Sequence, residues 1–517
     1  MSRAVPVSLR SLKEYGPRAW AETGQWPVSE QEFRLIVDSI DGAYETIYSS
    51  LDGVWRSAHQ TDSKFFEWMK QFVHAQVVRN RCETIGADEA TSYYAPLPTP
   101  SYRLGLRDSR SSVLEPLKQA RRQWLANSHQ GSWRRVRAFG GKDGIWSLGE
   151  VGRLKRDYLR NEKTSCVVIS PGSLFDGGFA SVDIPQGPRD VVGAVLSESA
   201  KVWSETLGVN VPLKHLLDLW LERTSYFGGC IVALSAQAKF PETLLVGSPG
   251  NALSRAAASV ARTEGAEVIV FQHGHNPGTT FARTLAHSEF TLGQSVACAT
   301  SGMAEAFRQL AARFSFSANK NTKFQSVKSR VYEEMRQVFL GYSSNKAKGR
   351  VVMVGYPMNT PAPRLSYGYG DFFALQIPLE LKVVDTLKRC GYQVVYKAHP
   401  DTASLVAPLF SDDVEVEKDM SFEATLLSAE TVVFTYPLTS ALGIALTSDR
   451  PIVMLDLAGR DWVPEVYADL ARRCAMVPAT LDDRNFISVN EGALIDGLVR
   501  APDLVCDDYF VKYMSQA

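Results

Sequence analysis

The hydrophobic and polar positions at the start of the chain follow a helical rhythm. One apolar stripe after Ser63 is formed by Phe65, Trp68, Met69, Phe72 and Gln76, with Lys64, Glu67, Lys70 and Gln71 off it. An earlier stripe contains Leu35, Ile36, Ile40, Tyr44, Ile47, Tyr48 and Leu51. This spacing is typical of amphipathic helices whose apolar face packs into a core. We therefore predict a mainly helical N-terminal region over residues 1–160.

After Cys166 the pattern changes to short apolar runs that end in turn residues. Residues 166–170 (CVVIS) precede a Pro-Gly pair, and residues 243–246 (TLLV) precede a turn with two glycines. A helical stretch ended by Gly265 then leads into residues 268–271 (VIVF). Strand, helix and strand in this order form a βαβ unit with buried parallel strands. We predict a first Rossmann-like domain over residues 161–345.

A second series of the same kind follows a polar connection over about residues 314–349. Its predicted strands are residues 351–354 (VVMV), 393–396 (QVVY), 431–434 (TVVF) and 452–455 (IVML). We predict a second Rossmann-like domain over residues 346–517, which closes with C-terminal helices. The fold class is therefore α/β, with two Rossmann-like domains that face a cleft and a helical N-terminal region. In such sheets ligands bind at the carboxyl ends of the strands.

Composition narrows the range of ligands. The 517 residues include 56 Lys plus Arg and 56 Asp plus Glu, so no net field draws in nucleic acid, and an anionic ligand needs a local site. The seven cysteines form neither a CxxC pair nor a zinc-type cluster with histidine, which predicts no disulfide framework and no structural zinc. No apolar run approaches the roughly 18 residues of a membrane span, and we expect a cytoplasmic protein.

Polar residues follow the predicted strand 268–271. Gln272, His273, Gly274 and His275 come directly after it, and Glu289 lies further along. Glycine lets the backbone approach a ligand, while imidazole and carboxylate groups transfer protons. The alternative is a capped turn with two surface histidines.

Two strand ends in the second half carry groups suited to phosphate. Lys397 and His399 offer positive or donor groups at the end of strand 393–396, and Pro400 fixes the following turn. After strand 431–434, Thr439 and Ser440 open a predicted helix, where a hydroxyl and backbone amides bind anions. The alternative for the second pair is an ordinary helix cap.

Other catalytic motifs are missing from the sequence. It contains no Gly-Lys-Ser/Thr phosphate loop, no GxGxxG after a strand, no GxSxG and no HExxH. One further carboxylate, Asp371, lies in the glycine- and aromatic-rich stretch 367–373. It is a candidate nucleophile or cation stabiliser, and its alternative role is a turn or helix-cap aspartate.

The segment 396–401 (YKAHPD) resembles the Lys-Pro-His-Pro-Asp strand end of bacterial capsule and O-antigen β-Kdo transferases, and the His-Pro motif of GT-B sialyltransferases. The Gln-His-Gly phrase at 272–274, followed by Glu289, is similar to a loop of surface-carbohydrate transferases. In the same broad group a helical N-terminal region carries a His, an aromatic-rich helix and an Arg. Residues here in that order are His59, Phe65, Phe66, Trp68 and Arg79 or Arg81.

This resemblance implies a metal-independent GT-B glycosyltransferase that binds its donor on the second domain and its acceptor on the first. The matching positions imply that His399, Thr439 and Ser440 bind CMP, and that the donor is a CMP-activated ulosonic or nonulosonic acid such as Kdo. Many GT-B enzymes have a glutamate after the Ser/Thr loop, whereas here Leu442 is followed by Gly443, so UDP donors remain open. The acceptor implied is a bacterial surface glycan, in capsule or lipopolysaccharide O-antigen.

Two other functions remain open. One is a polyol-phosphate transferase of the same fold that uses CDP-glycerol or CDP-ribitol. The other is a non-catalytic member that binds nucleotide or glycan. A basic, tryptophan-bearing stretch over residues 121–137, continued by Arg153, Lys155 and Arg156, is either a solvated face or a contact with an anionic membrane surface or acidic acceptor.

Overall fold

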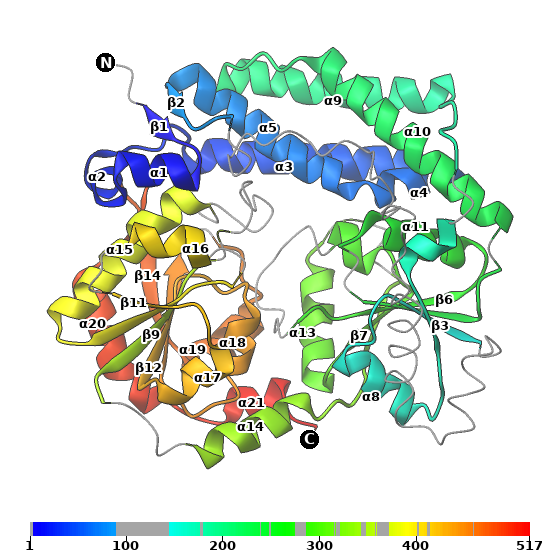
Figure 1. Cartoon of the computed structure of the whole chain (residues 1–517). Helices are drawn as coiled ribbons and strands as arrows, with labels where there is room; N and C mark the ends of the chain where they lie inside the picture. Colours follow the sequence, from blue (N-terminus) through cyan, green and yellow to red (C-terminus); the bar gives the residue numbers. More distant parts are fainter. Residues whose placement is uncertain are drawn as a thin grey trace.

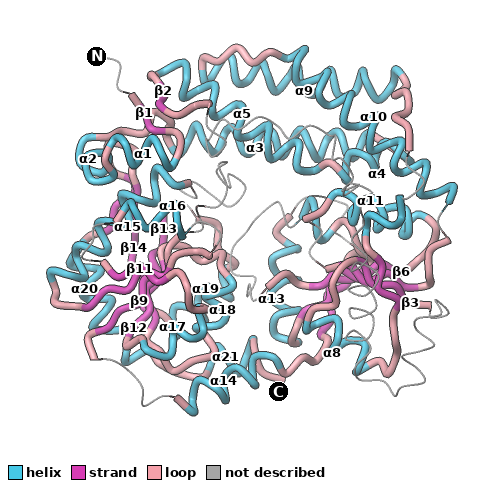
Figure 2. Tube along the Cα trace, in the orientation of Figure 1, coloured by secondary structure: helices cyan, strands magenta, loops and turns pink. Residues whose placement is uncertain are grey.

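The computed structural model shows two parallel sheets side by side, with a layer of long helices lying across both (Figure 1). Figure 2 shows the same arrangement by secondary structure, with each sheet flanked by helices. The structure describes residues 4–88, 144–175, 179–237, 239–247, 250–274, 286–314, 316, 321–342, 348–356, 358, 372–400, 403–410, 414–458 and 460–516.

The first sheet has six strands in the order β4-β3-β5-β6-β7-β8, and every pairing in it is parallel. The chain passes from β3 to β4 on one side of β3 and then crosses to β5 on the other side of β3. The topological switch point therefore lies between β3 and β5. The strands are β3 (Ile145–Leu148), β4 (Val167–Ile169), β5 (Thr243–Val246), β6 (Glu267–Phe271), β7 (Ser295–Cys298) and β8 (Lys323–Ser326).

This sheet begins earlier than the sequence predicted. Strand β3 and helix α8 (Arg153–Asn161) fall in the segment expected to be mainly helical, and β3 lies between β4 and β5 in the sheet. The run 145–148 (IWSL) is too short for its apolar pattern to distinguish strand from helix, and its pairing with β4 and β5 determines its conformation. The first Rossmann-like domain therefore includes residues before 161.

The helical layer is assembled from two separate parts of the chain. Trp203 donates its Nε1 proton to Ser39 Oγ at 2.8 Å, and Arg223 pairs bidentately with Asp62 at 2.5 and 2.6 Å, both between the two parts. No helix of the described residues is long and apolar enough to cross a membrane. The layer comprises α3 (Glu30–Ser50), α4 (Gly53–Thr61) and α5 (Ser63–Arg81), with α9 (Gln186–Leu207) and α10 (Leu213–Gln237) from between β4 and β5.

The second sheet has seven strands in the order β11-β10-β9-β12-β13-β14-β15, and only the β14–β15 pairing is antiparallel. This order places the switch point between β9 and β12. All four residues of β12 are buried, as expected for a strand covered on both faces. The strands are β9 (Arg350–Val354), β10 (Gln393–Lys397), β11 (Glu415–Glu417), β12 (Thr431–Phe434), β13 (Ile452–Leu457), β14 (Ala475–Leu481) and β15 (Ile487–Val489).

Helices cover both sheets. Over the first lie α11 (Ala252–Thr263) and α13 (Ser301–Ala312), and α14 (Val331–Gly341) leads to the second. The helices of the second domain are α15 (Phe373–Arg389), α16 (Ala403–Val406), α17 (Phe422–Ser428), α18 (Ser440–Ala445), α19 (Pro464–Arg473), α20 (Glu491–Arg500) and α21 (Asp508–Tyr513). The predicted fold class, α/β with two Rossmann-like domains in a GT-B-like arrangement, is confirmed.

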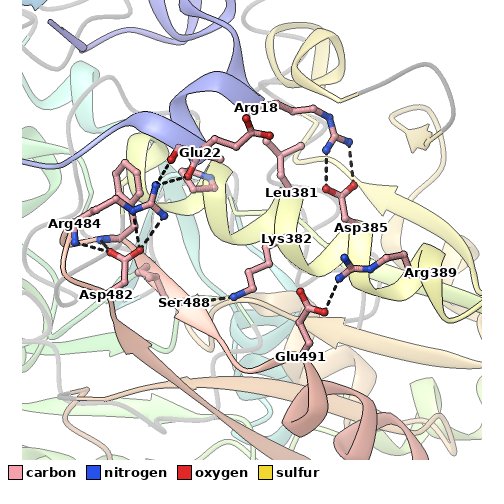
Figure 3. Close-up of a pocket in the computed structure, with 14 residues that line it drawn as sticks. Arg18, Glu22, Leu381, Lys382, Asp385, Arg389, Asp482, Arg484, Ser488 and Glu491 are labelled. Carbon is pink, nitrogen blue, oxygen red and sulfur yellow. Dashed lines mark hydrogen bonds and ion pairs between the residues drawn. The ribbon is translucent and has the colours of Figure 1, made fainter. Parts of the chain in front are cut away.

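Both ends of the chain cross between the domains. The N-terminal elements β1 (Val5–Pro6), α1 (Leu9–Tyr15), α2 (Pro17–Thr23) and β2 (Thr84–Ile85) join the helical layer to the second domain. Arg18 of α2 pairs with Asp385 of α15 at 2.6 Å, and Arg484 Nη1 donates to the carbonyls of Ala21 and Glu22 at 2.8 and 2.7 Å (Figure 3). At the other end, Thr300 before α13 donates to the Tyr513 carbonyl of α21.

Candidate functional site

In the polar segment after β6, Gln272 has a structural role and the two residues after it are exposed. Gln272 is buried, and its Oε1 accepts from the Ala299 amide at 3.2 Å, which fastens the end of β6 to the start of α13. His273 and Gly274 are exposed. The predicted partner His275 lies outside the described residues. Of this segment, therefore, the described groups that face outward are His273 and Gly274.

Gly274 brings the two domains together. Its φ of +59° lies in the left-handed region, where glycine has no steric cost. A side chain at this position would collide with the hydroxyl of Ser440, which opens α18 in the second domain. The end of β6 and the loop after β12, singled out separately in the sequence, therefore meet at this contact.

Glu289 is a nearly buried carboxyl group with no hydrogen-bond or ion-pair partner among the described residues. It lies in η2 (Ala286–Phe290), a single π-helical turn between β6 and β7. Its side chain is 8% exposed, and burial raises its pKa to about 7. A carboxyl group with this pKa and unoccupied bonding capacity has the properties of a general acid or base at neutral pH.

Lys397 and His399 lie where the sequence placed them, at the carboxyl end of β10. The Lys397 side chain is buried, and its Nζ donates only long bonds, at 3.4 Å, to the carbonyls of Ala398 and Glu417. No carboxylate pairs with it in the described part of the chain, and burial lowers its pKa. His399 is half-buried and Pro400 is exposed. An anion beside this buried ammonium group would stabilise its charged form.

Thr439 and Ser440 have different roles. Thr439 Oγ1 accepts from the Ala441 amide at 3.2 Å, so this hydroxyl is the ordinary helix cap of α18. The helix is only six residues long, and Leu442 and Gly443 within it are buried. Ser440 is exposed and faces Gly274. Of the two hydroxyls, Ser440 is the one that lies at the contact between the domains.

Sequence reasoning missed Glu380, a fully buried carboxyl group at the switch point of the second sheet. Its oxygens accept from the Tyr356 amide at 2.6 Å, the Tyr396 hydroxyl at 2.7 Å and the Thr435 hydroxyl at 3.2 Å. Burial raises its pKa to about 7 against these hydrogen bonds. It ties together the ends of β9, β10 and β12. A signal was present, because Glu380 falls at helical spacing between Ile377 and Val384 on an apolar stripe.

The N-terminal residues that carried the family resemblance are core and surface groups. His59 is buried, its ring stacks on Tyr44 at 4.6 Å, and burial lowers its pKa to about 3. Arg81 pairs with Glu32 at 2.6 Å and donates to the Pro27 carbonyl at 2.8 Å. Lys70, expected on the polar side of its helix, is completely buried.

The basic stretch is described only at its end. Residues 121–137 lie outside the described part. In α8, Arg153 pairs with Asp157 and Glu334 at 2.9 and 2.7 Å. Lys155 is buried, donates to Ser147 Oγ and the Leu148 carbonyl at 2.9 Å each, and has its pKa lowered to about 8 by burial. These two side chains therefore stabilise the first domain rather than forming an open cationic face.

An open pocket lies elsewhere, between α2, α15 and the β14–β15 turn (Figure 3). Its charged residues are mostly paired with one another, as in Arg389 with Glu491 at 2.6 Å, and Lys382 donates to Ser488 Oγ at 3.1 Å. None of the predicted site residues lines it. Within the described ranges no group of three or more His, Cys, Asp or Glu side chains is placed to hold a metal ion. Asp371 lies outside those ranges.

The topology defines a class: a two-domain α/β protein of GT-B-like architecture. No protein-family model and no curated protein matches the chain. Among solved structures it is similar to a UDP-GlcNAc 2-epimerase from Methanocaldococcus jannaschii bound to UDP-GlcNAc and UDP, with 11% identity over 69% of this chain and 92% of the other and a TM-score of 0.36. It is also similar to UGT2 from Phytolacca americana, complexed with UDP-2fluoro-glucose and pterostilbene (10% identity, 71% and 92% covered, TM-score 0.34). A third is a variant of Os79 from O. sativa in complex with UDP (9%, 71% and 92%, TM-score 0.35). These resemblances are distant, with identities of 9–11%.

Proposed function

We propose that the protein is a glycosyltransferase that moves an ulosonic or nonulosonic acid from a CMP-activated donor to a bacterial surface glycan. The observation that carries the proposal is the contact between Gly274 and Ser440. It brings the carboxyl end of β6, after which Glu289 follows along the chain, to the second domain, whose strand β10 ends at the buried Lys397. The family resemblance of residues 396–401 supports the CMP-linked donor.

In this proposal the second domain binds the donor. Lys397 and His399 face the nucleotide phosphate and stabilise the negative charge that develops as the sugar–phosphate bond breaks. Ser440 donates its hydroxyl proton to the same phosphate. No metal is required by this scheme, because the protein supplies the charge that a metal would otherwise provide.

The first domain binds the acceptor. Glu289 takes the proton of the acceptor hydroxyl while the oxygen of that hydroxyl forms a bond to the anomeric carbon of the donor. CMP leaves with the electrons of the broken bond between the sugar and the phosphate. His273 is the alternative base. If the enzyme retains configuration, Asp371 is the candidate nucleophile. The acceptor glycan, and any contact of the protein with the inner face of the membrane that carries it, belong to the same proposal.

A thermal-shift titration with CMP, CDP, UMP, UDP and GDP tests the donor. A ligand at a hundredfold excess over its dissociation constant stabilises the native state by about 2.7 kcal/mol, which raises the melting temperature. We expect selective stabilisation by CMP that is lost in His399→Ala and retained in His215→Ala, which alters an exposed histidine of α10. Stabilisation by UDP alone would overturn the CMP donor, and no response would favour a non-catalytic protein.

Product analysis separates the enzyme classes. Both a sugar transferase and a polyol-phosphate transferase release CMP, from a CMP-sugar and a CDP-polyol respectively. The mass gained by the acceptor differs, because one adds a sugar acid and the other adds glycerol phosphate or ribitol phosphate. Gain of a polyol phosphate would overturn the proposed reaction.

A further inference from the structure

The π-helical turn η2 is fixed to the helical layer through one side chain, His287. Its Nε2 lies 3.0 Å from Glu45 Oε1, and its Nδ1 lies 3.7 Å from Asp41 Oδ1; both carboxylates belong to α3. The ring packs on Tyr44, with centroids 4.3 Å apart, and edge-on to Phe316 at 5.6 Å. His287 is 3% exposed, so these contacts surround it.

Further hydrogen bonds hold the backbone of the same turn. The His287 carbonyl accepts from the Thr291 hydroxyl at 3.0 Å and from the Tyr44 hydroxyl at 3.4 Å. Thr291 Oγ1 in turn accepts from Gln60 Nε2 of α4 at 3.0 Å. Two helices that are distant in sequence from η2 therefore determine where this turn lies.

The anchor is itself supported by a buried ion pair. Lys70 Nζ of α5 lies 2.7 Å from Asp41 Oδ1 and 3.0 Å from Glu67 Oε1. The charged and titratable groups around His287 are Asp41, Tyr44 and Glu45 of α3 and His59 of α4. Lys70 and Glu67 of α5 act through Asp41, with which Lys70 pairs.

Glu289 lies two residues beyond His287 in the same turn. Residues two apart in a helical turn do not face each other, so a side chain that fixes His287 to α3 leaves Glu289 directed away from that helix. The thiol of Cys298 on β7 is the titratable group that interacts with Glu289 electrostatically. π-helical turns are rare and frequently lie at functional sites.

We infer that His287, held by Glu45 and Asp41, is a positioning residue that keeps the Glu289 carboxyl group in its solvent-poor location. This inference rests on the proposed function, in which Glu289 is the base that deprotonates the acceptor hydroxyl. The helical layer then contributes to the active site without itself contacting the substrates.

The test compares His287→Ala with His287→Gln, whose amide restores a donor toward Glu45. In His287→Ala, η2 is released and Glu289 becomes hydrated, so the limb of the pH–kcat profile due to Glu289 moves from near 7 toward 4.5. We expect kcat to fall about 10-fold or more with the donor KM unchanged, and His287→Gln to restore most of both. An unchanged pH limb, or a loss expressed only in KM, would overturn the inference.

A second measurement does not depend on activity. Glu289→Gln removes a carboxyl group that is costly to ionise when buried. We therefore expect the variant to be more stable than the wild type at pH 8, and this gain to exceed the gain at pH 5 by up to about a hundredfold in the unfolding equilibrium constant. In the His287→Ala background this pH-dependent gain should disappear, whereas it should persist with His74→Gln, a change to a buried histidine of α5 that stacks on Trp26. Persistence of the gain with His287→Ala would overturn the inference. If wild-type protein transfers no sugar, the proposed function fails, but this measurement still decides the role of His287.

If His287→Ala fails to fold, Glu45→Gln replaces it, since that change removes the charge at 3.0 Å from the imidazole and keeps the side-chain volume. The same loss of pH-dependent gain is then expected, and its absence would again overturn the inference.

Discussion

The two sheet domains each hold a buried carboxyl group near the end of a strand, and the two groups differ in one respect. Burial raises the pKa of both Glu289 and Glu380 to about 7. Glu380 accepts three hydrogen bonds, whereas Glu289 accepts none from the described residues. A similarly raised pKa is thus found in Glu380, whose oxygens accept hydrogen bonds from the protein, and in Glu289, whose oxygens accept none from the described residues. A raised pKa alone does not identify a catalytic residue.

The largest effect should come from Glu289→Gln. The amide cannot take a proton from the acceptor, so we expect sugar transfer to fall by about 10²- to 10⁴-fold without loss of stability. Turnover of the CMP-sugar measures this, with Glu267→Gln, an exposed carboxyl group at the start of β6, as the control. Full activity of Glu289→Gln would transfer the role of base to His273 and remove the contrast between the domains.

Glu380→Ala should mainly affect stability. It leaves the Tyr356 amide and the Tyr396 and Thr435 hydroxyls without their acceptor, at about 1–3 kcal/mol for each unsatisfied buried group, and we expect a loss of about 3 kcal/mol or more. Urea unfolding measures it. Asp385→Asn on the same helix breaks only the exposed pair with Arg18 and should cost less than about 1 kcal/mol. Equal losses in the two variants would contradict a structural role for Glu380.

The smallest effect is the pH dependence of stability. A carboxyl group with a folded pKa near 7 and an unfolded value near 4.5 is protonated more readily in the native state. The stabilisation of the native state by this protonation is therefore complete below pH 4.5 and is lost as the pH rises to 7. We expect each group to contribute about 2 kcal/mol between pH 5 and 8, measured by urea unfolding at both values. The wild-type protein could instead become more stable from pH 5 to pH 8, with Glu289→Gln leaving that change as it is. This result would show that the pKa of neither carboxyl group is raised.

The sequence predicted the strands best where the apolar run was long and uninterrupted. The runs 268–271, 351–354 and 431–434 all lie within buried parallel strands, because a strand covered on both faces has a nearly continuous apolar sequence. Lys397 and His399 lie at the end of β10, as their order in the sequence predicted, whereas no sequence pattern predicted the π-helical turn that holds Glu289. β3 was missed because its four residues give no distinct period, and its place in the sheet depends on pairing with β5.

Periodicity also failed for charged residues inside helices. Lys70 was assigned to the polar face of its helix, yet it is completely buried between Asp41 and Glu67. A charged side chain at a core position is recognisable only when its partner, here from a helix elsewhere in the chain, is known. Glu380 was overlooked for the same reason, since its three donors come from three different strands.

The sequence by itself determined the α/β class, the two series of parallel strands and the chemical groups at their ends, because these depend on local spacing and on burial of neighbouring residues. The tertiary structure decided which of those groups remain available. The side-chain oxygens of Gln272 and Thr439 accept from backbone amides, whereas in the described part of the chain the Glu289 carboxyl group accepts no hydrogen bond and no carboxylate pairs with Lys397. It also brought Gly274 to Ser440 and His287 to Glu45. Contacts between residues so far apart in the chain follow from how the domains pack, and no local pattern encodes them.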